Sequence, residues 1–122
     1  MMEKQYQVDD GLLQAFHLMY DNFPEPVQLT HKSRTILAIN PAGKAAGKDV
    51  GLVCAKLGPP EGHKICQANK ALKDQKTTWA YVDATPTGGR KFVTFWLPIA
   101  GYPDFYIHFS CGNRLDYSAL RP

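Results

Sequence analysis

The sequence predicts an α+β fold, in which one five-stranded antiparallel sheet carries short helices on one face and follows an N-terminal amphipathic helix. Apolar residues at helical spacing open the chain, and its last third is rich in β-branched and aromatic residues. Between them, two short strands precede a run of helical segments. This order of helix, strands, helices and strands is typical of α+β domains. The length of 122 residues suits a single domain, 1–122, with its core at about 10–112.

The N-terminal helix is predicted over residues 10–22. Its apolar side chains step by four, three and four along the sequence, which is the periodicity of one helix face. The stripe consists of Leu12, Phe16, Met19 and Phe23, widened by Leu13 and Tyr20. Asp9 or Asp10 can cap the first amides, and the prolines at 24 and 26 prevent the helix from continuing.

A hairpin and a capped helix follow. Residues 26–31 and 35–39 read as two short strands, and the polar segment 32–34 reads as the turn between them. Asn40 is well suited to a helix N-cap, and Pro41 is well suited to the first helical position. The sequence therefore predicts a short helix over residues 41–46, ended by Gly47.

The remaining elements are two helical segments and three strands. A helical turn is predicted near residues 50–56, a loop at 58–62, and a helix at 63–74 with Ile65, Ala68 and Leu72 on one face. Strands are predicted at 77–84, 90–99 and 105–111, joined by turn-forming segments into an antiparallel meander. The last two strands are apolar on both faces, so both faces need cover. The middle helices can cover one face, and the N-terminal helix or a second copy of the chain must cover the other.

Composition narrows the class of protein. The net charge is only +3, without an arginine cluster, which argues against a nucleic-acid partner. No apolar run is long enough for a membrane span, and the N-terminus lacks a secretory pattern, so we expect a cytoplasmic protein without membrane contact. No serine lies in a nucleophile motif, no carboxylates pair at helical spacing, and the segment 42–49 departs from the phosphate-loop pattern. The sequence therefore predicts a protein that is not an enzyme.

Three thiols and a histidine form a candidate metal or redox site. Cys54, His63 and Cys66 lie close together in sequence, and Cys111 would complete four ligands if the fold brought it near. The spacing of Cys54 and Cys66 does not match a Cys-x-x-Cys half-site. Buried or incidental thiols are the alternative.

The order of elements resembles the PAS superfamily. The segment PVQLTHKSRTILAINPA, residues 26–42, is similar to the family's opening hairpin and its asparagine-capped helix, and Val50-Gly51 stands where the family often has a hydrophobic-glycine pair. The resemblance covers about residues 10–112. It implies a five-stranded antiparallel sheet, a pocket between the sheet and the middle helices, and dimerisation through the N-terminal helix.

The resemblance also suggests which residues form the site. We expect a small pocket lined by apolar residues of the last two strands and of the middle segments: Leu57, Ile65, Leu72, Phe95, Leu97, Ile107 and Phe109. A homodimer would use the stripe of the first helix: Leu12, Phe16, Met19, Tyr20 and Phe23.

Cofactors of the family can be weighed on individual residues. Haem-binding members place an axial histidine on the helix equivalent to 63–74, but helical spacing sets His63 nearly opposite Ile65, Ala68 and Leu72, which favours an exposed histidine. The flavin photosensors carry Asn-Cys-Arg-Phe-Leu-Gln, whereas the segment around Cys54 here reads LVCAKL, so flavin is not expected.

The sequence thus predicts a stand-alone PAS-like sensor, which binds a small molecule and signals through protein contacts with a partner. A metal- or haem-binding redox sensor and a ligand-free dimerisation module are the alternatives. His108, between aromatic residues on the last strand, is interpreted as a satisfied core or interface histidine.

Overall fold

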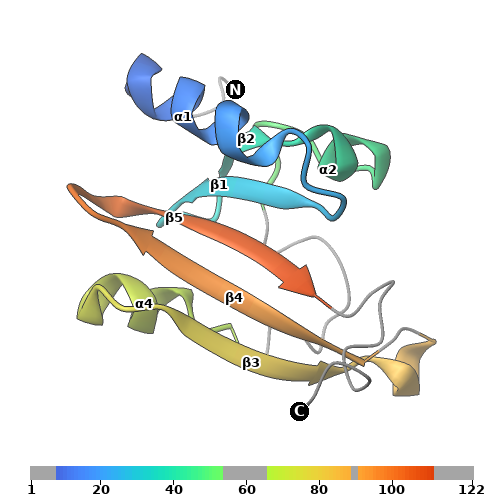
Figure 1. The fold of residues 1–122 in the computed structure, drawn as a ribbon. Helices are drawn as coiled ribbons and strands as arrows, with labels where there is room; N and C mark the ends of the chain where they lie inside the picture. The colour runs from blue at the N-terminus through green and yellow to red at the C-terminus, as the bar shows by residue number, and fades with distance from the viewer. Residues whose placement is uncertain (1–7, 54–65, 89–90, 112–122) are drawn as a thin grey trace, which may run out of the picture.

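The computed structural model describes residues 8–53, 66–88 and 91–111, which form a five-stranded antiparallel sheet with helices packed against it (Figure 1). In chain order the elements are α1 (Asp10–Tyr20), β1 (Val27–His31), β2 (Ile36–Ile39), α2 (Pro41–Ala45), α4 (Ala68–Asp74), β3 (Thr78–Asp83), the 3₁₀ turn η2 (Thr85–Thr87), β4 (Lys91–Ile99) and β5 (Tyr102–Cys111). The predicted fold class is confirmed. None of the helices within these three ranges is long and apolar enough to cross a membrane.

The strands lie in the order β2-β1-β5-β4-β3. The first and last strands pair antiparallel at the centre of the sheet, from Val27 opposite Phe109 to His31 opposite Phe105. The predicted hairpin of β1 and β2 is present, and so is the predicted meander of β3, β4 and β5. Because β1 and β5 are central, their side chains form the middle of both faces.

Some boundaries differ from the predicted ones. α1 ends at Tyr20, two residues early, and α4 begins at Ala68, since the two residues before it are not helical. β5 begins at Tyr102 rather than at 105, because the turn from β4 takes only two residues. The second of these is Gly101, with φ 84°, a conformation that glycine adopts without strain. Residues 50–53 form a turn and a single bridge, and 54–65 lie outside the described residues.

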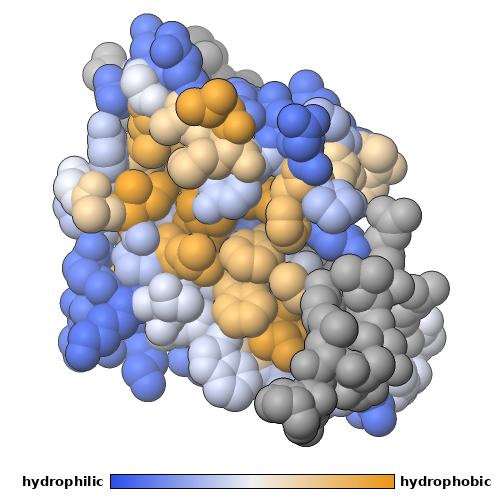
Figure 2. Space-filling view, in the orientation of Figure 1, coloured by the Kyte–Doolittle hydropathy of each residue, from blue (hydrophilic) through white to orange (hydrophobic). Residues whose placement is uncertain are grey.

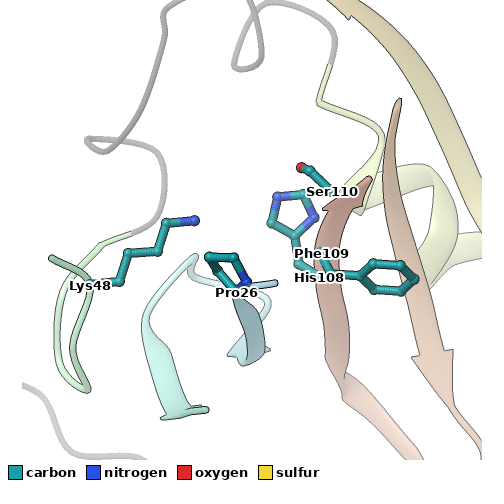
Figure 3. A pocket seen from close by; sticks show the side chains of 5 residues that line it. All are labelled: Pro26, Lys48, His108, Phe109 and Ser110. Atoms are coloured by element: carbon teal, nitrogen blue, oxygen red, sulfur yellow. The ribbon is translucent and has the colours of Figure 1, made fainter. Parts of the chain in front are cut away.

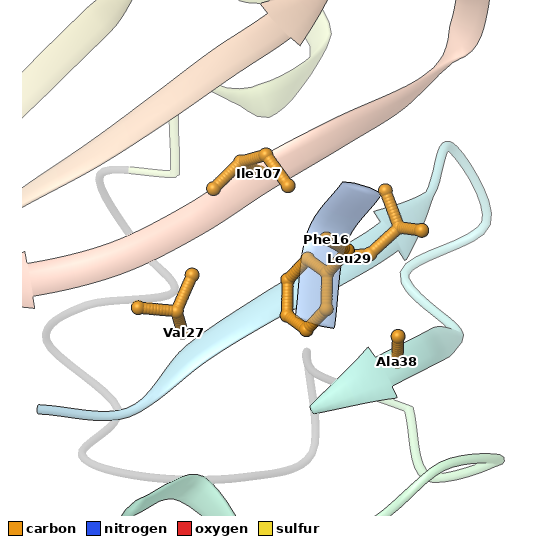
Figure 4. Packing of buried hydrophobic residues seen from close by; sticks show 5 residues of the cluster. All are labelled: Phe16, Val27, Leu29, Ala38 and Ile107. Atoms are coloured by element: carbon orange, nitrogen blue, oxygen red, sulfur yellow. The ribbon is translucent and has the colours of Figure 1, made fainter. Parts of the chain in front are cut away.

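α1 covers one face of the sheet, which we call the outer face. Its Phe16 is 1% exposed and packs with Val27, Leu29, Ala38 and Ile107 (Figure 4). Side chains alternate along a strand, so these residues of β1, β2 and β5 share one face. The N-terminal helix of the same chain therefore covers this face, as one of the two expectations stated. Further apolar residues of the helix pack around this cluster: Leu12, Leu13, Tyr20 and Phe23.

Met19 departs from the predicted stripe. At about 100° per residue it lies about 60° around the helix from Phe16, at the edge of the buried face. Its side chain is 63% exposed, and the neighbouring Leu18 is 87% exposed. α1 thus buries a narrower stripe than the sequence predicted, and presents two large apolar side chains to solvent.

α4 covers the opposite face, which we call the inner face. Its Ala68 and Ala71 are buried against Trp96 of β4 and Tyr106 of β5. Two alanines let the helix approach closely enough to contact both aromatic rings. The expectation that helices cover both faces of the sheet is confirmed.

The start of α1 is tied to β5. Asp9 is the N-cap residue, but its side chain makes no capping hydrogen bond; its carboxylate instead accepts a hydrogen bond of 2.8 Å from the Tyr102 hydroxyl. The predicted capping role of this aspartate is therefore wrong. The hydrogen bond to Asp9 raises the pKa of Tyr102 above its ordinary value of 10.0, with smaller contributions from desolvation and from the carboxylate charge.

The hydrogen bond from Tyr102 to Asp9 is expected to break in alkaline solution. Folding raises the pKa of Tyr102. The hydrogen bond therefore contributes fully to the free energy of unfolding below the ordinary tyrosine pKa, and this contribution is lost as the pH rises through the raised pKa. Subtracting the tyrosinate absorbance titration of Tyr102→Phe from that of the wild type should give a curve centred above pH 10.0. A midpoint at or below that value would contradict the assignment.

Candidate functional site

The structure does not bring the predicted pocket residues together. Phe95 and Phe109 are opposite each other on β4 and β5, with their rings stacked at 5.2 Å, and Leu97 is opposite Ile107. All four lie on the outer face, beside or beneath α1, whereas Leu72 packs with the inner-face cluster under α4. The prediction that these residues line one pocket is wrong, because β4 and β5 are apolar on both sides and hydropathy does not reveal which side faces α4. Leu57 and Ile65 lie outside the described residues.

Part of the predicted set lines a hollow on the outer face. This hollow has a volume of about 270 Å³ and lies between α1 and the hairpin of β4 and β5. Figure 2 shows hydrophobic side chains gathered below α1 on this face of the molecule. The hollow is lined by Leu12, Phe16, Met19, Tyr20, Leu97, Pro98, Ile99, Ala100 and Ile107.

The inner face, in contrast, carries polar side chains from the same central strands. Gln28 and Thr30 of β1 are buried, and their register partners on β5 are His108 and Tyr106. Thr94 of β4 is also buried, and its hydroxyl donates to the Phe109 carbonyl at 3.3 Å. The alternation of Gln28 and Thr30 with Val27 and Leu29 predicts that the two polar side chains face outward, whereas the structure buries both.

A small cavity lies at one end of this polar face. Its volume is about 50 Å³, and it is lined by Pro26, Lys48, His108, Phe109 and Ser110. Figure 3 shows the Lys48 amine reaching across the gap toward His108, with the Ser110 hydroxyl beside the imidazole. The Phe109 ring points away to the other side of β5, as strand alternation requires. The polar groups at this cavity therefore come from β5 and from the segment that follows α2.

His108 is held on two sides. Its Nδ1 donates a hydrogen bond to the Phe95 carbonyl at 2.9 Å, and its ring stacks on Trp96 with a centroid distance of 5.0 Å and an interplanar angle of 13°. This geometry agrees with the interpretation of His108 as a satisfied histidine of the core. Because Nδ1 is the donor to a carbonyl, Nε2 is the second polar atom of the ring.

Gln28 is incompletely satisfied. It is 1% exposed, and its Nε2 donates to the Thr30 hydroxyl at 2.9 Å. Its Oε1 has no hydrogen-bond partner within the described ranges. The two amide orientations are related by a half-turn, so in the alternative orientation Thr30 donates to Oε1 and the amide nitrogen lacks an acceptor. Either way one buried amide atom of Gln28 lacks a partner among the described residues, which is costly unless another group or a water supplies one.

Asn40 connects the two sides of the molecule. Its side chain is fully buried, and Oδ1 accepts hydrogen bonds from the backbone N–H groups of Val27 and Gly43, at 2.9 and 3.0 Å. The first belongs to β1, and the second confirms the predicted N-cap of α2. The connection is close: a Cβ on Gly43 would lie 2.3 Å from the Ile39 side chain, so glycine is needed there.

The amide nitrogen of Asn40 holds the end of α1. Nδ2 lies within hydrogen-bond distance of the carbonyls of Tyr20, Phe23 and Glu25, at 3.1, 3.3 and 2.9 Å. One carboxamide thus joins the end of α1, the connection to β1, and the beginning of α2. The sequence indicated the capping role through Asn-Pro, but the contacts to a helix 20 residues upstream carry no local signal.

The candidate metal ligands are not assembled by the described residues. Cys66 is exposed and precedes α4, whereas Cys111 ends β5 on the side that faces outward with Phe109. Cys54 and His63 lie outside the described residues. Within ranges 8–53, 66–88 and 91–111, no group of three or more metal-ligating side chains occurs. The metal and haem hypotheses remain predictions.

Fit to a large cofactor can be tested on the cavity itself. Pockets that hold drug-sized molecules measure about 300–1,000 Å³. The cavity beside His108 measures about 50 Å³, and Trp96 and Tyr106 fill the neighbouring space beneath α4. As lined by the described residues, this cavity is smaller than a haem or flavin molecule needs, and the expectation about flavin stays a prediction.

The strand order and the helices on both faces define a PAS fold, and comparison with solved structures supports this. The PAS domain of BvgS from Bordetella pertussis is similar with a TM-score of 0.66 and 17% identity, over 91% of this chain and 92% of that one. A LOV protein of Rhodobacter sphaeroides is similar with a TM-score of 0.65 and 15% identity, over 93% and 74%. The sequence matches no model of a known family and no curated protein. The protein therefore has the PAS fold, and the resemblance of its element order is confirmed at the level of the fold.

Proposed function

We propose that the protein is a cytoplasmic sensor module, which binds a small molecule on the inner face and signals through protein contacts of α1 and the outer face. The observation that carries this proposal is the position of Asn40. Its Oδ1 is bonded to α2, which precedes Lys48 at the inner cavity, and its Nδ2 is bonded to the end of α1. A change on the inner face therefore has a short physical route to the helix on the outer face.

This route consists of consecutive hydrogen bonds. The backbone N–H of Lys48 donates to the carbonyl of Gly43 at 3.0 Å, and the N–H of Gly43 donates to Asn40. A ligand that binds one arrangement of Lys48 more tightly than another shifts the equilibrium between the two arrangements. The free energy of that shift is at most the difference between the two binding free energies. Signalling of this kind requires that the packed position of α1 be only moderately lower in free energy than other positions of the helix.

The test is whether occupancy of the inner face changes α1. Full-length protein is screened by thermal shift against acetate, inorganic phosphate, neutral amides and other small metabolites. Any compound that raises Tm is then examined by hydrogen exchange, and the amides of residues 10–23 are expected to change exchange rate by about threefold or more. Stabilising compounds that leave these amides unchanged would contradict the signalling role. The absence of any binding or co-purifying molecule would contradict the pocket.

We propose that the outer face signals through contacts within a homodimer. Of the interface predicted on the stripe of the first helix, Phe16 is buried in the core of its own chain, and Leu12, Tyr20 and Phe23 pack around it. The large apolar side chains exposed on the outer face or its rim are instead Leu18, Met19, Trp79 and Tyr81. Exposed apolar residues gathered on one face are typical of protein interaction sites.

Met19 provides the test of this interface. We expect Met19→Glu to weaken dimerisation at least tenfold, about 1.4 kcal/mol, because a charge would be buried at the contact. The matched control is Gln14→Glu, which adds the same charge to an exposed position of α1. Solution mass measured by light scattering over a concentration series distinguishes the variants. Equal dimer affinity for Met19→Glu and wild type, or a monomeric wild type, would refute the interface.

A further inference from the structure

We propose that the outer edge of β3 is an interaction surface, at which this strand pairs antiparallel with β3 of a second copy of the chain. The two five-stranded sheets would then continue into each other across a two-fold axis. This contact goes beyond the one proposed at Met19 and does not depend on it, because α1 packs on β1, β2 and β5 whereas β3 is the last strand at the far side of the sheet. The two contacts together would allow association beyond a dimer.

The first argument is the regularity of this edge. All six residues of β3 pair with β4 without a shift in register, and no other described strand lies beyond β3 (Figure 1). The outer N–H and C=O groups of an edge strand are a template for pairing with another chain, and natural edges are commonly protected by lysine, proline or a bulge. The sequence of β3, TWAYVD, contains neither lysine nor proline, and its register contains no bulge.

The second argument is the contrast with the other edge, which the chain itself covers. β2 has only four residues, and the segment after α2 pairs with its start. The N–H of Gly51 donates to the Ile36 carbonyl at 2.8 Å, and the N–H of Ile36 donates to the Leu52 carbonyl at 2.9 Å. A bridge between Thr35 and Val53 extends this cover. Within the described ranges, the sheet therefore has one covered edge and one open edge.

The third argument is that the side chains of β3 are complementary to their own copy. Trp79 is opposite Phe95 on β4, so Trp79 and Tyr81 point to the outer face, where they are 63% and 55% exposed. With a two-fold axis through Ala80, each Trp79 is opposite Tyr81 of the second copy on the same face of the joined sheet. Such cross-strand aromatic pairs stabilise a sheet, and they would cover two large rings that a single copy leaves in solvent.

The charges at the two ends of β3 favour the antiparallel direction. Lys76 precedes the strand and Asp83 ends it, and both are exposed. Because antiparallel strands run in opposite directions, each Lys76 would lie beside Asp83 of the second copy, once at each end of the contact. Asp83 is already opposite Lys91 on β4 and accepts a hydrogen bond from the N–H of Thr85 at 3.0 Å. We therefore expect the charges to set the direction of pairing and to add little to its affinity.

Hydrogen exchange of the full chain, measured by NMR at low and high protein concentration, tests the pairing directly. The amides of residues 78–82 that point away from β4 should exchange rapidly at low concentration and about tenfold or more slowly at high concentration. A contact between faces would cover side chains without providing acceptors for these amides. Protection that depends on concentration therefore distinguishes pairing at the edge from contact at the outer face.

Substitutions at the edge supply the second measurement, by sedimentation velocity over a concentration series. Tyr81→Lys places a lysine on the open strand and should weaken association about tenfold or more, whereas Tyr81→Phe should stay within about threefold of the wild type. Val50→Lys is the matched control: Val50 is 54% exposed and lies outside β3, so this variant should associate as the wild type does. Lys76→Glu leaves the strand unchanged, should weaken association by about twofold to threefold, and remains informative if Tyr81→Lys unfolds.

Any of three results would overturn the inference. The first is equal association of Tyr81→Lys and wild type. The second is rapid exchange of the outer β3 amides at every concentration, which would show that the edge stays in solvent. The third is protection that does not change with concentration, which would show that the edge is covered within one chain.

Failure of this contact is distinguishable from failure of the contact proposed at Met19. Weaker association of Tyr81→Lys with unchanged association of Met19→Glu supports the β3 edge and contradicts the contact on α1. The reverse pattern supports the contact on α1 and contradicts pairing at the edge.

Discussion

Replacing Asn40 with alanine is expected to lower the free energy of unfolding by on the order of 3–5 kcal/mol. The substitution removes the N-cap of α2 and leaves the buried N–H of Val27 without its acceptor. It also removes the donor that lies 2.9–3.3 Å from the carbonyls of Tyr20, Phe23 and Glu25. Urea unfolding monitored by circular dichroism measures the change.

Two further variants separate the roles of Asn40. Asn40→Asp keeps an acceptor for α2 but replaces the donor with a second oxygen facing carbonyls, so we expect a loss as large as that of the alanine variant. Asn69→Ala removes an exposed asparagine that accepts a hydrogen bond from Arg34 at 2.9 Å, and should change stability by no more than about 0.5 kcal/mol. A loss below about 1 kcal/mol in Asn40→Ala would show that water replaces these contacts, and would remove the proposed route between the faces.

The fold was predictable because local patterns and the order of elements agree. The polar turn between β1 and β2, the Asn-Pro start of α2, and the aromatic strands at the end each specify one element. The β5 start was misplaced because a two-residue turn at Ala100 and Gly101 is shorter than the segment of turn-forming residues suggests. Local composition indicates that a turn exists more reliably than where its strands resume.

The candidate site was less predictable because it depends on which face of the sheet meets which helix. The sequence shows Phe95 and Trp96 as equally apolar neighbours, yet Phe95 faces outward and Trp96 lies beneath α4. A one-residue difference in register exchanges the two faces, and nothing local to β4 fixes it. Polar residues such as Gln28 and Thr30 carried the missing information, because an inner face with buried hydrogen-bonding groups differs from an outer face covered by α1.

The attachment of α1 provides the second large effect. Phe16→Ala is expected to destabilise the protein by about 3–5 kcal/mol, the range for removing a buried phenylalanine ring from a core. Phe16 is 1% exposed and contacts side chains from β1, β2 and β5, so its removal leaves a cavity under the helix. Leu18→Ala is the matched control on the same helix; because Leu18 is 87% exposed, its stability should stay within about 0.5 kcal/mol of the wild type.

The distribution of this loss bears on the sensor proposal. If α1 is a separate layer that a signal can release, Phe16→Ala should increase hydrogen exchange at residues 10–20 more than in β4 and β5, since local opening then needs less free energy than global unfolding. The milder Phe16→Leu should show the same pattern with a smaller loss, and remains informative if the alanine variant unfolds. A uniform increase of exchange across helix and sheet would mean that α1 is an inseparable part of the core, and output through its movement would then be excluded.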